Sequence, residues 1–296
     1  IESAKKLELT HQLLVRHNTD LNDSIDYASR IQRVMLPKVE HIKTAFPESF
    51  ILWKPLQKVS GDFYWFAETN MEPRFAKDAL IENGMVSIFK GFVEGKKIIA
   101  AIDCTGHGIP GAFMSMMGDA YLNQIVNNEG ITQPQLILHE LDILIRHALK
   151  QDDGGNADGM DMAMCVVNPN QNIIEFSGAK NGIIYVKAGE ATLIRGDRFS
   201  IGGANYEDEE KNFTRHIIPI DQTTNFYLYS DGLPDQFGGD RAKKFSSKQM
   251  QAFFATNAEK GMQEQFELLQ QTVSDWMADY EQIDDILVIG VKVEVN

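Results

Sequence analysis

Four short acidic motifs lie far apart in the chain, each beside an apolar run that reads as a β-strand. The motifs are VSGDFYW around Asp62, AAIDCTGHG around Asp103, LYSDG around Asp231, and IDDILVIGV around Asp284 and Asp285. A carboxylate at a strand end is costly to bury unless a positive charge meets it. We therefore expect a fold that brings these strand ends together around a cation.

A hard, oxygen-binding cation suits a set of carboxylates. Mg²⁺ and Mn²⁺ take carboxylate, carbonyl and water ligands, whereas the sequence has no CxxC or Cys/His spacing that would suit zinc. Asp followed by Gly is also an ordinary turn signal, so one such motif alone is more often a loop than a ligand. The prediction of a Mn²⁺ or Mg²⁺ site therefore depends on the whole set.

Composition and charge narrow the class of protein. The chain has 296 residues, 43% of them hydrophobic, which is enough to bury one large core or two small ones. Its net charge of −14 argues against a nucleic-acid backbone or an anionic membrane as the main partner. No apolar stretch approaches the roughly 20 residues that span a bilayer. Two cysteines, Cys104 and Cys165, are too few for a disulfide framework, and we expect a cytoplasmic protein.

The first 38 residues differ from the rest, with no Gly and no Pro before Pro37. The chain begins at Ile1 without Met, so we expect this segment to follow an upstream sensor or receptor domain in a longer protein, either soluble or membrane-bound. A helix should end near Pro37. Apolar residues recur in it every seven residues, and a second, more polar seam follows four residues later: Leu7, Leu14, Leu21, Ala28 and Met35, then His11, Asn18, Ile25 and Gln32.

This heptad pattern supports two interpretations that we weigh evenly. A Leu seam beside Asn, His and Gln is typical of a short coiled coil with a specified register, which would make the protein a homodimer. The same pattern fits an amphipathic helix packed on its own domain.

The remaining chain alternates runs of strands with pairs of helices. Apolar patterns predict strands over 50–54, 61–67, 85–93 and 97–102, and helices over 110–128 and 133–150. Hairpin-connected strands follow, then a helical region over 246–280 and a closing strand in DILVIGVKVEV. Such an order favours an α+β fold with antiparallel sheets over strict βαβ alternation.

One motif points to a different class of protein. Gly106, Gly108 and Gly111 satisfy G-x-G-x-x-G after a strand, which is the formal fingerprint of a dinucleotide-binding oxidoreductase. Asp103 would repel a pyrophosphate there, and no acid-ended strand follows about 20 residues later. We therefore expect these glycines to pack a turn against a metal-binding loop.

Six segments occur in a characteristic order: IQRVMLP, VSGDFYWF, DCTGHGIPGAFMSMMG, SGAKNG, YSDG followed by DQFGG, and DDILVIGV. This order resembles the metal-dependent phosphatases of the protein phosphatase 2C-like (PPM) superfamily, in the bacterial branch of sporulation stage II E and Rsb-type serine phosphatases. The resemblance covers about residues 30–295. It implies a phosphatase domain over 39–296 after a helical linker over 1–38, with two antiparallel sheets flanked by helix pairs.

The resemblance also implies roles for the acidic residues in a centre of two or more metal ions. Asp103 would bridge both metals, and Cys104 would lend its backbone carbonyl. Asp231 would be a second direct ligand. Asp284 is the first choice for the third and Asp285 a close second, while Asp62 would hold metal-bound waters.

Several positions depart from the relatives' pattern. Those with a His two residues after the bridging Asp use it as a general acid, whereas here that position is Thr105 and the histidine is His107. His107 is then either the acid or part of the turn. Lys58 is a substitute for a missing phosphate-binding arginine, and residues 69–90 resemble an insertion without an assigned role. Two further residues are either site-lining or turn residues: Asp161 and Asn181.

The leading hypothesis is a metal-dependent phosphoserine or phosphothreonine protein phosphatase. The resemblance implies a phosphorylated anti-sigma-factor antagonist of the STAS type as substrate, and sigma-factor regulation as the process. A non-catalytic dimerisation or binding module with the same fold is the alternative. Intact acids at all four motifs argue against that module.

Overall fold

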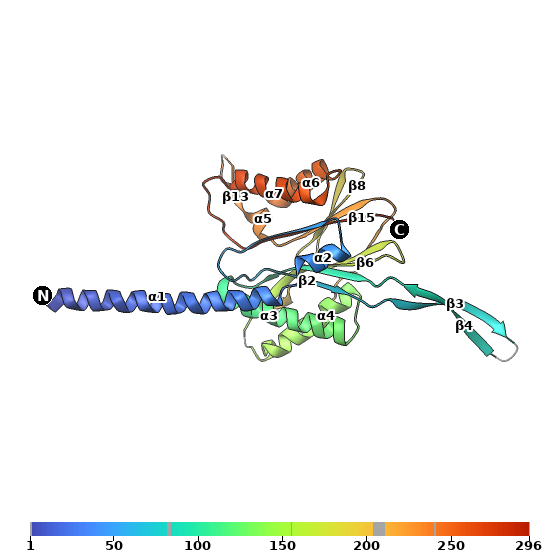
Figure 1. Ribbon diagram of the computed structural model, residues 1–296, viewed down its shortest axis with the longest axis horizontal. Helices are drawn as coiled ribbons and strands as arrows, with labels where there is room; N and C mark the ends of the chain where they lie inside the picture. The colour runs from blue at the N-terminus through green and yellow to red at the C-terminus, as the bar shows by residue number, and fades with distance from the viewer. Residues whose placement is uncertain (1, 82–83, 155, 204–210, 240, 296) are drawn as a thin grey trace.

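Two antiparallel sheets, packed face to face, form the centre of the protein in the computed structural model, which describes residues 2–81, 84–154, 156–203, 211–239 and 241–295. Figure 1 shows the sheets between two layers of helices. The first sheet has the order β1-β15-β12-β8-β9, with bounds Ser49–Lys54, Ile286–Val293, Thr224–Tyr229, Ile183–Lys187 and Glu190–Ile194. The second has the order β11-β7-β6-β5-β2 with β10 beside β6, and bounds His216–Pro219, Ile173–Ala179, Gly159–Asn168, Lys97–Cys104, Phe63–Glu68 and Ile201–Gly202.

The central strands are apolar on both faces because both faces are covered. In β5, Ile99 and Ala101 point into the core between the sheets, whereas Ile98, Ala100 and Ile102 belong to the core under the helices. Alternation between an apolar and a polar face is therefore lost, and such a strand reads as a continuous apolar run. This confirms the predicted α+β class with stacked antiparallel sheets.

Each sheet carries a helix pair on its outer face. α3 (Gly108–Asn123), followed by a π-helical turn (Gln124–Asn128), and α4 (Pro134–Ala148) cover the second sheet. α6 (Ser246–Asn257) and α7 (Met262–Met277) cover the first. The helical region predicted over 246–280 is thus two helices. The smaller elements are α2, a 3₁₀ turn, α5, β13 and β14, with bounds Val39–Ala45, Gln151–Asp153, Gly232–Asp235, Phe237–Gly238 and Lys243–Lys244.

Helix α1 (Glu2–Met35) projects from this body along much of its length (Figure 1). It ends two residues before Pro37, as predicted. Leu7, Leu14 and Leu21 on the heptad seam are exposed by 72%, 58% and 54%. Its C-terminal part instead packs beside α3, where Gln32 is buried. None of the helices in the described part of the chain is long and apolar enough to cross a membrane.

Gln32 attaches the end of α1 to the segment that precedes β2. Its Nε2 donates to the backbone oxygen of Ser60 at 2.6 Å and to Ser115 Oγ on α3 at 2.9 Å. Its Oε1 accepts from the Ser60 amide at 3.1 Å. The side chain that the heptad pattern places on a polar coiled-coil seam is therefore used within the domain.

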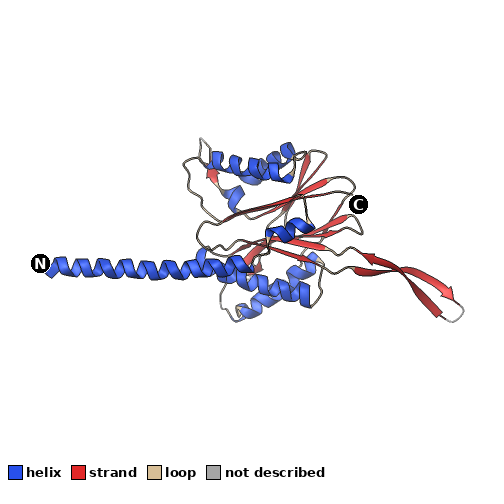
Figure 2. Cartoon of the chain, viewed as in Figure 1, coloured by secondary structure: helices blue, strands red, loops and turns tan. Residues whose placement is uncertain are grey.

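The region predicted as an insertion is a two-stranded ribbon. β3 (Glu72–Ile81) and β4 (Gly84–Val93) pair only with each other among the described strands, and Figure 2 shows them extending away from the sandwich. The pattern predicted only the second of these strands. The pairing register shifts twice along the ribbon, so the first strand lacks a regular two-residue alternation that would identify it.

Candidate metal centre

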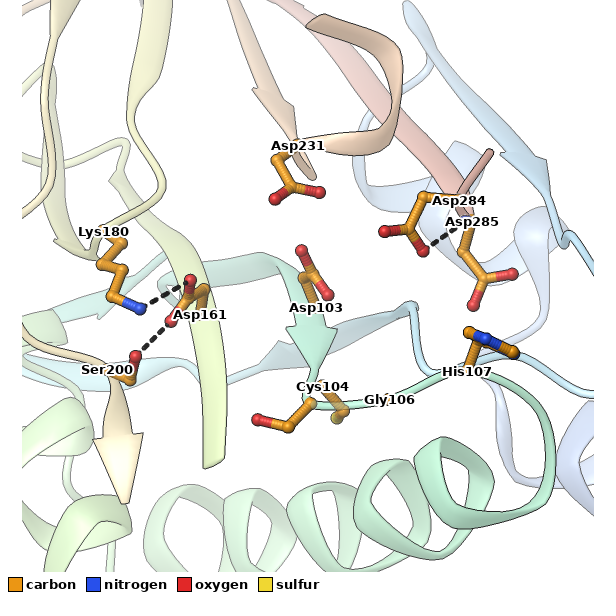
Figure 3. Close-up of a pocket in the computed structure, with 11 residues that line it drawn as sticks. Asp103, Cys104, Gly106, His107, Asp161, Lys180, Ser200, Asp231, Asp284 and Asp285 are labelled. Carbon is orange, nitrogen blue, oxygen red and sulfur yellow. Dashed lines mark hydrogen bonds and ion pairs between the residues drawn. The ribbon is translucent and has the colours of Figure 1, made fainter. Parts of the chain in front are cut away.

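Three strands deliver aspartates to one end of the sandwich. Asp103 is next to last in β5, Asp231 lies two residues after β12, and Asp284 lies two residues before β15. Figure 3 shows the carboxylates of Asp103 and Asp231 turned toward each other, with Asp284 beside them. A pocket of about 200 Å³ lies here, lined by Asp103, Cys104, Thr105, Gly106, His107, Asp161, Lys180, Ser200, Asp231, Asp284 and Asp285.

The turn after Asp103 is built from glycines. Gly106 and Gly108 have positive φ angles of 83° and 66°, a conformation that residues with a Cβ avoid. A Cβ on Gly111 would lie 2.2 Å from the Gly106 carbonyl oxygen and 2.7 Å from Gly61 Cα. These glycines therefore pack the turn against the loop before Asp62, and the preceding strand belongs to an antiparallel sheet rather than to a dinucleotide-binding βαβ unit.

Burial and neighbouring charge raise the pKa of Asp103 to about 8. Burial is the largest cause, followed by the carboxylates of Asp231, Asp161 and Asp284. Asp161 lies directly opposite Asp103 on the adjacent strand β6, where side chains share one face of the sheet. The pocket is thus a place where negative charge is destabilised and a cation would be bound favourably.

The pKa values of two further pocket carboxyls, Asp231 and Asp284, are raised as well. Burial raises the pKa of Asp231, and Asp284 and Asp235 raise it further. Burial also raises the pKa of Asp284, although the backbone amide of Asp285 donates a hydrogen bond that opposes the shift. The carboxylates of Asp103, Asp231 and Asp284 therefore belong to one cluster of negative charge.

Asp62 interacts with Asp103 but is not among the residues that line the pocket. It is 2% exposed, and its Oδ2 is buried without a hydrogen-bond partner. Burial, then Asp103, raises the pKa of this carboxyl well above its usual range, while the side chain of Ser230 opposes the shift. A buried oxygen without a partner is costly, and a cation or a water beside it would remove that cost.

Asp285 is used differently from its neighbour Asp284. Its Oδ1 accepts from the Leu56 amide at 2.6 Å, and its Oδ2 from the amides of Gly61 at 2.8 Å and Asp62 at 3.4 Å. The side chain is buried, and these bonds fix the loop that carries Asp62. Asp285 therefore holds a loop, whereas Asp284 turns its carboxylate into the pocket (Figure 3).

The donor set fits a hard divalent cation. The pocket offers carboxylate oxygens, and Asp62 adds a buried oxygen without a hydrogen-bond partner. Mg²⁺ and Mn²⁺ prefer such oxygen ligands. Within the described residues, no three His, Cys, Asp or Glu side chains are close enough to hold one ion as they stand. The carboxylates would therefore have to draw together around it.

Cys104 and Thr105 stabilise the end of β5. Burial raises the pKa of the Cys104 thiol, which keeps it neutral. The Thr105 hydroxyl donates to the Gly159 carbonyl at 3.0 Å and accepts from the Gly159 amide at 2.9 Å. The residue at the position of the relatives' histidine thus joins β5 to the start of β6.

His107 lines the outer edge of the pocket. Its Nδ1 lies 3.0 Å from Gln57 Nε2, which holds the ring in place. Lys58 is elsewhere, because its ammonium pairs with Asp26 of α1 at 2.7 Å. Asn181 is not a lining residue either, although it is buried and its Nδ2 lacks a partner.

Sequence reasoning missed two residues of the pocket. Ser200 donates to Asp161 Oδ1 at 2.6 Å, and the ammonium of Lys180 lies 3.4 Å from Asp161 Oδ2. Lys180 belongs to the SGAKNG segment, in which only the asparagine was considered. Lys180 directly follows the observed strand β7, and this place at a strand end was the available signal, whereas Ser200 lies in a loop without a pattern.

Comparison with known proteins agrees with this architecture. The model of the stage II sporulation protein E family matches residues 94–294. The SiaA-PP2C domain of Pseudomonas aeruginosa is 28% identical, with a TM-score of 0.77 over 94% of this chain and 99% of that chain. The comparison with curated proteins gave no match.

More distant structures share the fold. The PP2C phosphatase domain with a regulatory fragment of SpoIIE from Bacillus subtilis is 14% identical, with a TM-score of 0.58 over 84% of this chain and 64% of that chain. The serine/threonine phosphatase of S. agalactiae is 16% identical, with a TM-score of 0.55 over 83% of this chain and 99% of that chain.

Proposed function

This chain is a PP2C-type phosphatase domain that belongs to the stage II sporulation protein E family, and from this premise we propose that it hydrolyses phosphoserine or phosphothreonine on a regulatory protein. The observation that carries the proposal is the convergence of Asp103, Asp231 and Asp284 on one pocket, with the pKa of each raised by burial and by its acidic neighbours. In such a site the ionised carboxylates repel one another, and a bound cation would relieve that repulsion.

In this proposal Asp103, Asp231 and Asp284 would hold two Mn²⁺ or Mg²⁺ ions at the strand ends, with Asp103 shared by both ions and the carbonyl of Cys104 as a neutral oxygen donor. Asp62 would contribute directly or through water, and Asp285 holds the loop that carries Asp62. The chemistry that such a pair supplies when bound is neutralisation of the phosphate charge and activation of water.

The histidine at the pocket edge is our candidate for the proton donor. The contact with Gln57 orients the ring through Nδ1, which leaves Nε2 for the leaving serine oxygen. A general acid must come within hydrogen-bond reach of the atom that it protonates. His107 is therefore a catalytic residue in this proposal rather than only part of the turn.

We propose a phosphorylated STAS-type regulatory protein as the substrate, on the basis of family membership. The pocket volume of about 200 Å³ suits one phosphorylated side chain and not a larger ligand, so most recognition of the partner would occur outside it.

The decisive experiment measures metal-dependent release of phosphate from a phosphoserine peptide. Addition of Mn²⁺ should start hydrolysis, and Asp103→Asn should lower kcat at least about a hundred-fold, because electrostatic stabilisation of the transition state is lost. Asp275→Asn, an exposed aspartate on α7 that accepts from Gln271, is the matched control. Equal activity in Asp103→Asn and in the unsubstituted protein would refute the assignment. An absence of Mn²⁺ binding by calorimetry would instead favour the non-catalytic module.

We also propose that α1 joins a second copy of this chain and an upstream sensor. The exposed leucines at positions 7, 14 and 21 lie seven residues apart, which is the spacing of a coiled-coil seam. The buried end of the same helix contacts Ser60 through Gln32, two residues from Asp62. A change in the coiled coil could therefore alter the position of a metal ligand.

Sedimentation velocity tests the pairing of α1. The full chain should sediment as a dimer, and Leu14→Glu with Leu21→Glu should give a monomer, because charges on the seam repel each other. Arg16→Glu, off the seam, should stay dimeric. A chain that is monomeric before the substitutions would exclude the coiled coil.

A further inference from the structure

Lys180 carries a permanent positive charge in a pocket that is otherwise acidic. Among the described residues that line the pocket, five are aspartates, and Lys180 is the one lysine or arginine. A phosphomonoester carries about −1.5 to −2 charges at neutral pH, so it would meet strong repulsion from the protein alone. Any cationic side chain that faces this pocket is therefore a candidate for phosphate binding.

The sheet places Lys180 in line with Asp103. Asp103 on β5 pairs with Asp161 on β6, and the next residue of β6, Met162, pairs with Ala179 on β7. Lys180 therefore stands at the end of the same cross-strand row. Neighbouring strands are about 4.8 Å apart, so its backbone is roughly 10 Å from that of Asp103. Lys180 and Asp103 also line the same pocket, so a phosphate bound there would lie near both residues.

The backbone at this position is held firmly. Lys180 has a φ of 56°, which is unusual for a residue with a Cβ. Its amide donates to the Asp197 carbonyl at 2.7 Å, and the Asp197 amide donates to the Gly178 carbonyl at 2.8 Å. Residues in such conformations persist where the surrounding structure enforces them, and they are concentrated at functional sites.

The side chain, in contrast, is weakly held. The side chain is 53% exposed and its ammonium lies 3.4 Å from Asp161 Oδ2, whereas the ammonium of the buried Lys211 lies 2.7 Å from Asp142 Oδ1. Exposed pairs contribute little to stability. The other oxygen of Asp161 accepts from Ser200 at 2.6 Å, so Asp161 would stay in place if the lysine turned away (Figure 3).

We propose that Lys180 binds the phosphate of the substrate. The ammonium leaves Asp161 and contacts a non-bridging phosphate oxygen, and it returns to Asp161 when inorganic phosphate departs. This assignment rests on the proposed phosphatase function, and it replaces Lys58, whose partner is Asp26 on α1.

The test compares Lys180→Met with Lys58→Met, because both remove one lysine charge and only the first lies at the pocket. With a phosphoserine peptide and Mn²⁺, Lys180→Met should raise KM about tenfold, which is the usual effect of losing one charge-assisted hydrogen bond. The inhibition constant of inorganic phosphate should rise by a similar factor. Lys58→Met should leave both values within about twofold, and Lys180→Arg should restore most of the loss because arginine also binds phosphate.

A binding measurement makes the test independent of turnover. In the Asp231→Asn background, fluorescence anisotropy should show that Lys180→Met weakens binding of the phosphorylated peptide and not of its unphosphorylated form. Should the methionine variant fold poorly, Lys180→Asn also removes the charge and suits a positive φ.

The outcomes separate the two proposals. Unchanged KM, inhibition constant and peptide affinity in both neutral variants, with the unsubstituted protein active, would overturn the role of Lys180 alone. A lower kcat with these three values unchanged would overturn it as well. An unsubstituted protein that neither hydrolyses nor binds the phosphopeptide in Mn²⁺ would overturn the phosphatase function and the role of Lys180 together.

Discussion

Asp103 lies half-buried in the pocket and Asp142 is buried on α4, and the groups around these two carboxylates differ. Asp142, on α4, accepts from the Lys211 ammonium at 2.7 Å and from the Gly202 amide at 2.6 Å. Lys211 in turn donates to the carbonyls of Ser200 and Gly202. Around Asp103, the neighbouring groups that shift its pKa most are other carboxylates.

The groups that face each carboxylate indicate whether it contributes to stability or to function. A buried charge that has a counter-ion and hydrogen bonds is stabilised within the protein, whereas carboxylates that face each other raise the free energy of the folded state. The Lys211 pair also fixes the segment that carries Ser200, which contacts Asp161 in the pocket. The Lys211–Asp142 pair therefore stabilises the fold, whereas the carboxylates around Asp103 repel one another and would be stabilised by a bound cation.

The largest expected effect comes from removing one member of the buried pair. Lys211→Met should lower the free energy of unfolding by about 3 kcal/mol, because the buried Asp142 loses its nearest counter-ion and keeps only the more distant Arg146 at 3.9 Å. Urea denaturation followed by circular dichroism measures this change. The double variant with Asp142→Asn should recover part of the loss. A loss below about 1 kcal/mol in the single variant would show that the pair is solvated.

A smaller effect distinguishes the adjacent aspartates of the DD motif. Asp285→Ala should lower the free energy of unfolding by about 1–3 kcal/mol, since the amides of Leu56 and Gly61 lose their acceptor. Asp284→Ala should change the stability of the metal-free protein less, because the Asp285 amide loses its acceptor while one source of repulsion disappears. Both variants should lose phosphatase activity.

Calorimetric titration with Mn²⁺ completes this comparison. Asp284→Ala should abolish one binding event, whereas folded Asp285→Ala should still bind metal with reduced affinity. The reverse result would make Asp285 the ligand and would contradict the roles that their hydrogen bonds indicate.

The pH dependence of stability gives a separate comparison, which rests on the raised pKa of Asp103. Because the pKa of Asp103 is raised to about 8 in the folded protein, the folded state retains this proton at pH values where the unfolded chain has lost it. Its contribution to stability is fully present below the unfolded pKa of about 4 and is lost as pH rises through about 8. Melting temperatures of the metal-free protein should therefore fall over this range. Asp103→Asn should flatten the decrease, and an identical slope in that variant would contradict the assignment.

Much of the fold was predictable from local pattern. The strands over 50–54 and 97–102 and the helices over 110–128 and 133–150 match the observed elements closely, because continuous apolar runs and helical spacing are local properties. The family was also identified from the order of the motifs, and the family model confirms it. The strand over 72–81 was missed because its pairing is irregular.

The site was only partly predictable, for a physical reason. Sequence reasoning named the acids of all four motifs but left Asp284 and Asp285 as alternatives, since adjacent aspartates are equivalent in a pattern. Hydrogen bonds from residues over 220 positions away distinguish them. Similarly, Lys58 was chosen for its closeness in sequence to Asp62, whereas antiparallel pairing brings Lys180 to the row of Asp103.

The sequence by itself determined the class of fold, the residue types of a metal centre and a helix with a heptad of leucines. Only the tertiary structure decided which acids face the pocket, which one holds a loop, and which lysine accompanies them. It also decided that Gln32 is bound to Ser60 and Ser115 rather than placed on a coiled-coil seam. The reason is that a motif specifies chemical groups, whereas the direction of each group depends on strand register and on partners distant in the chain.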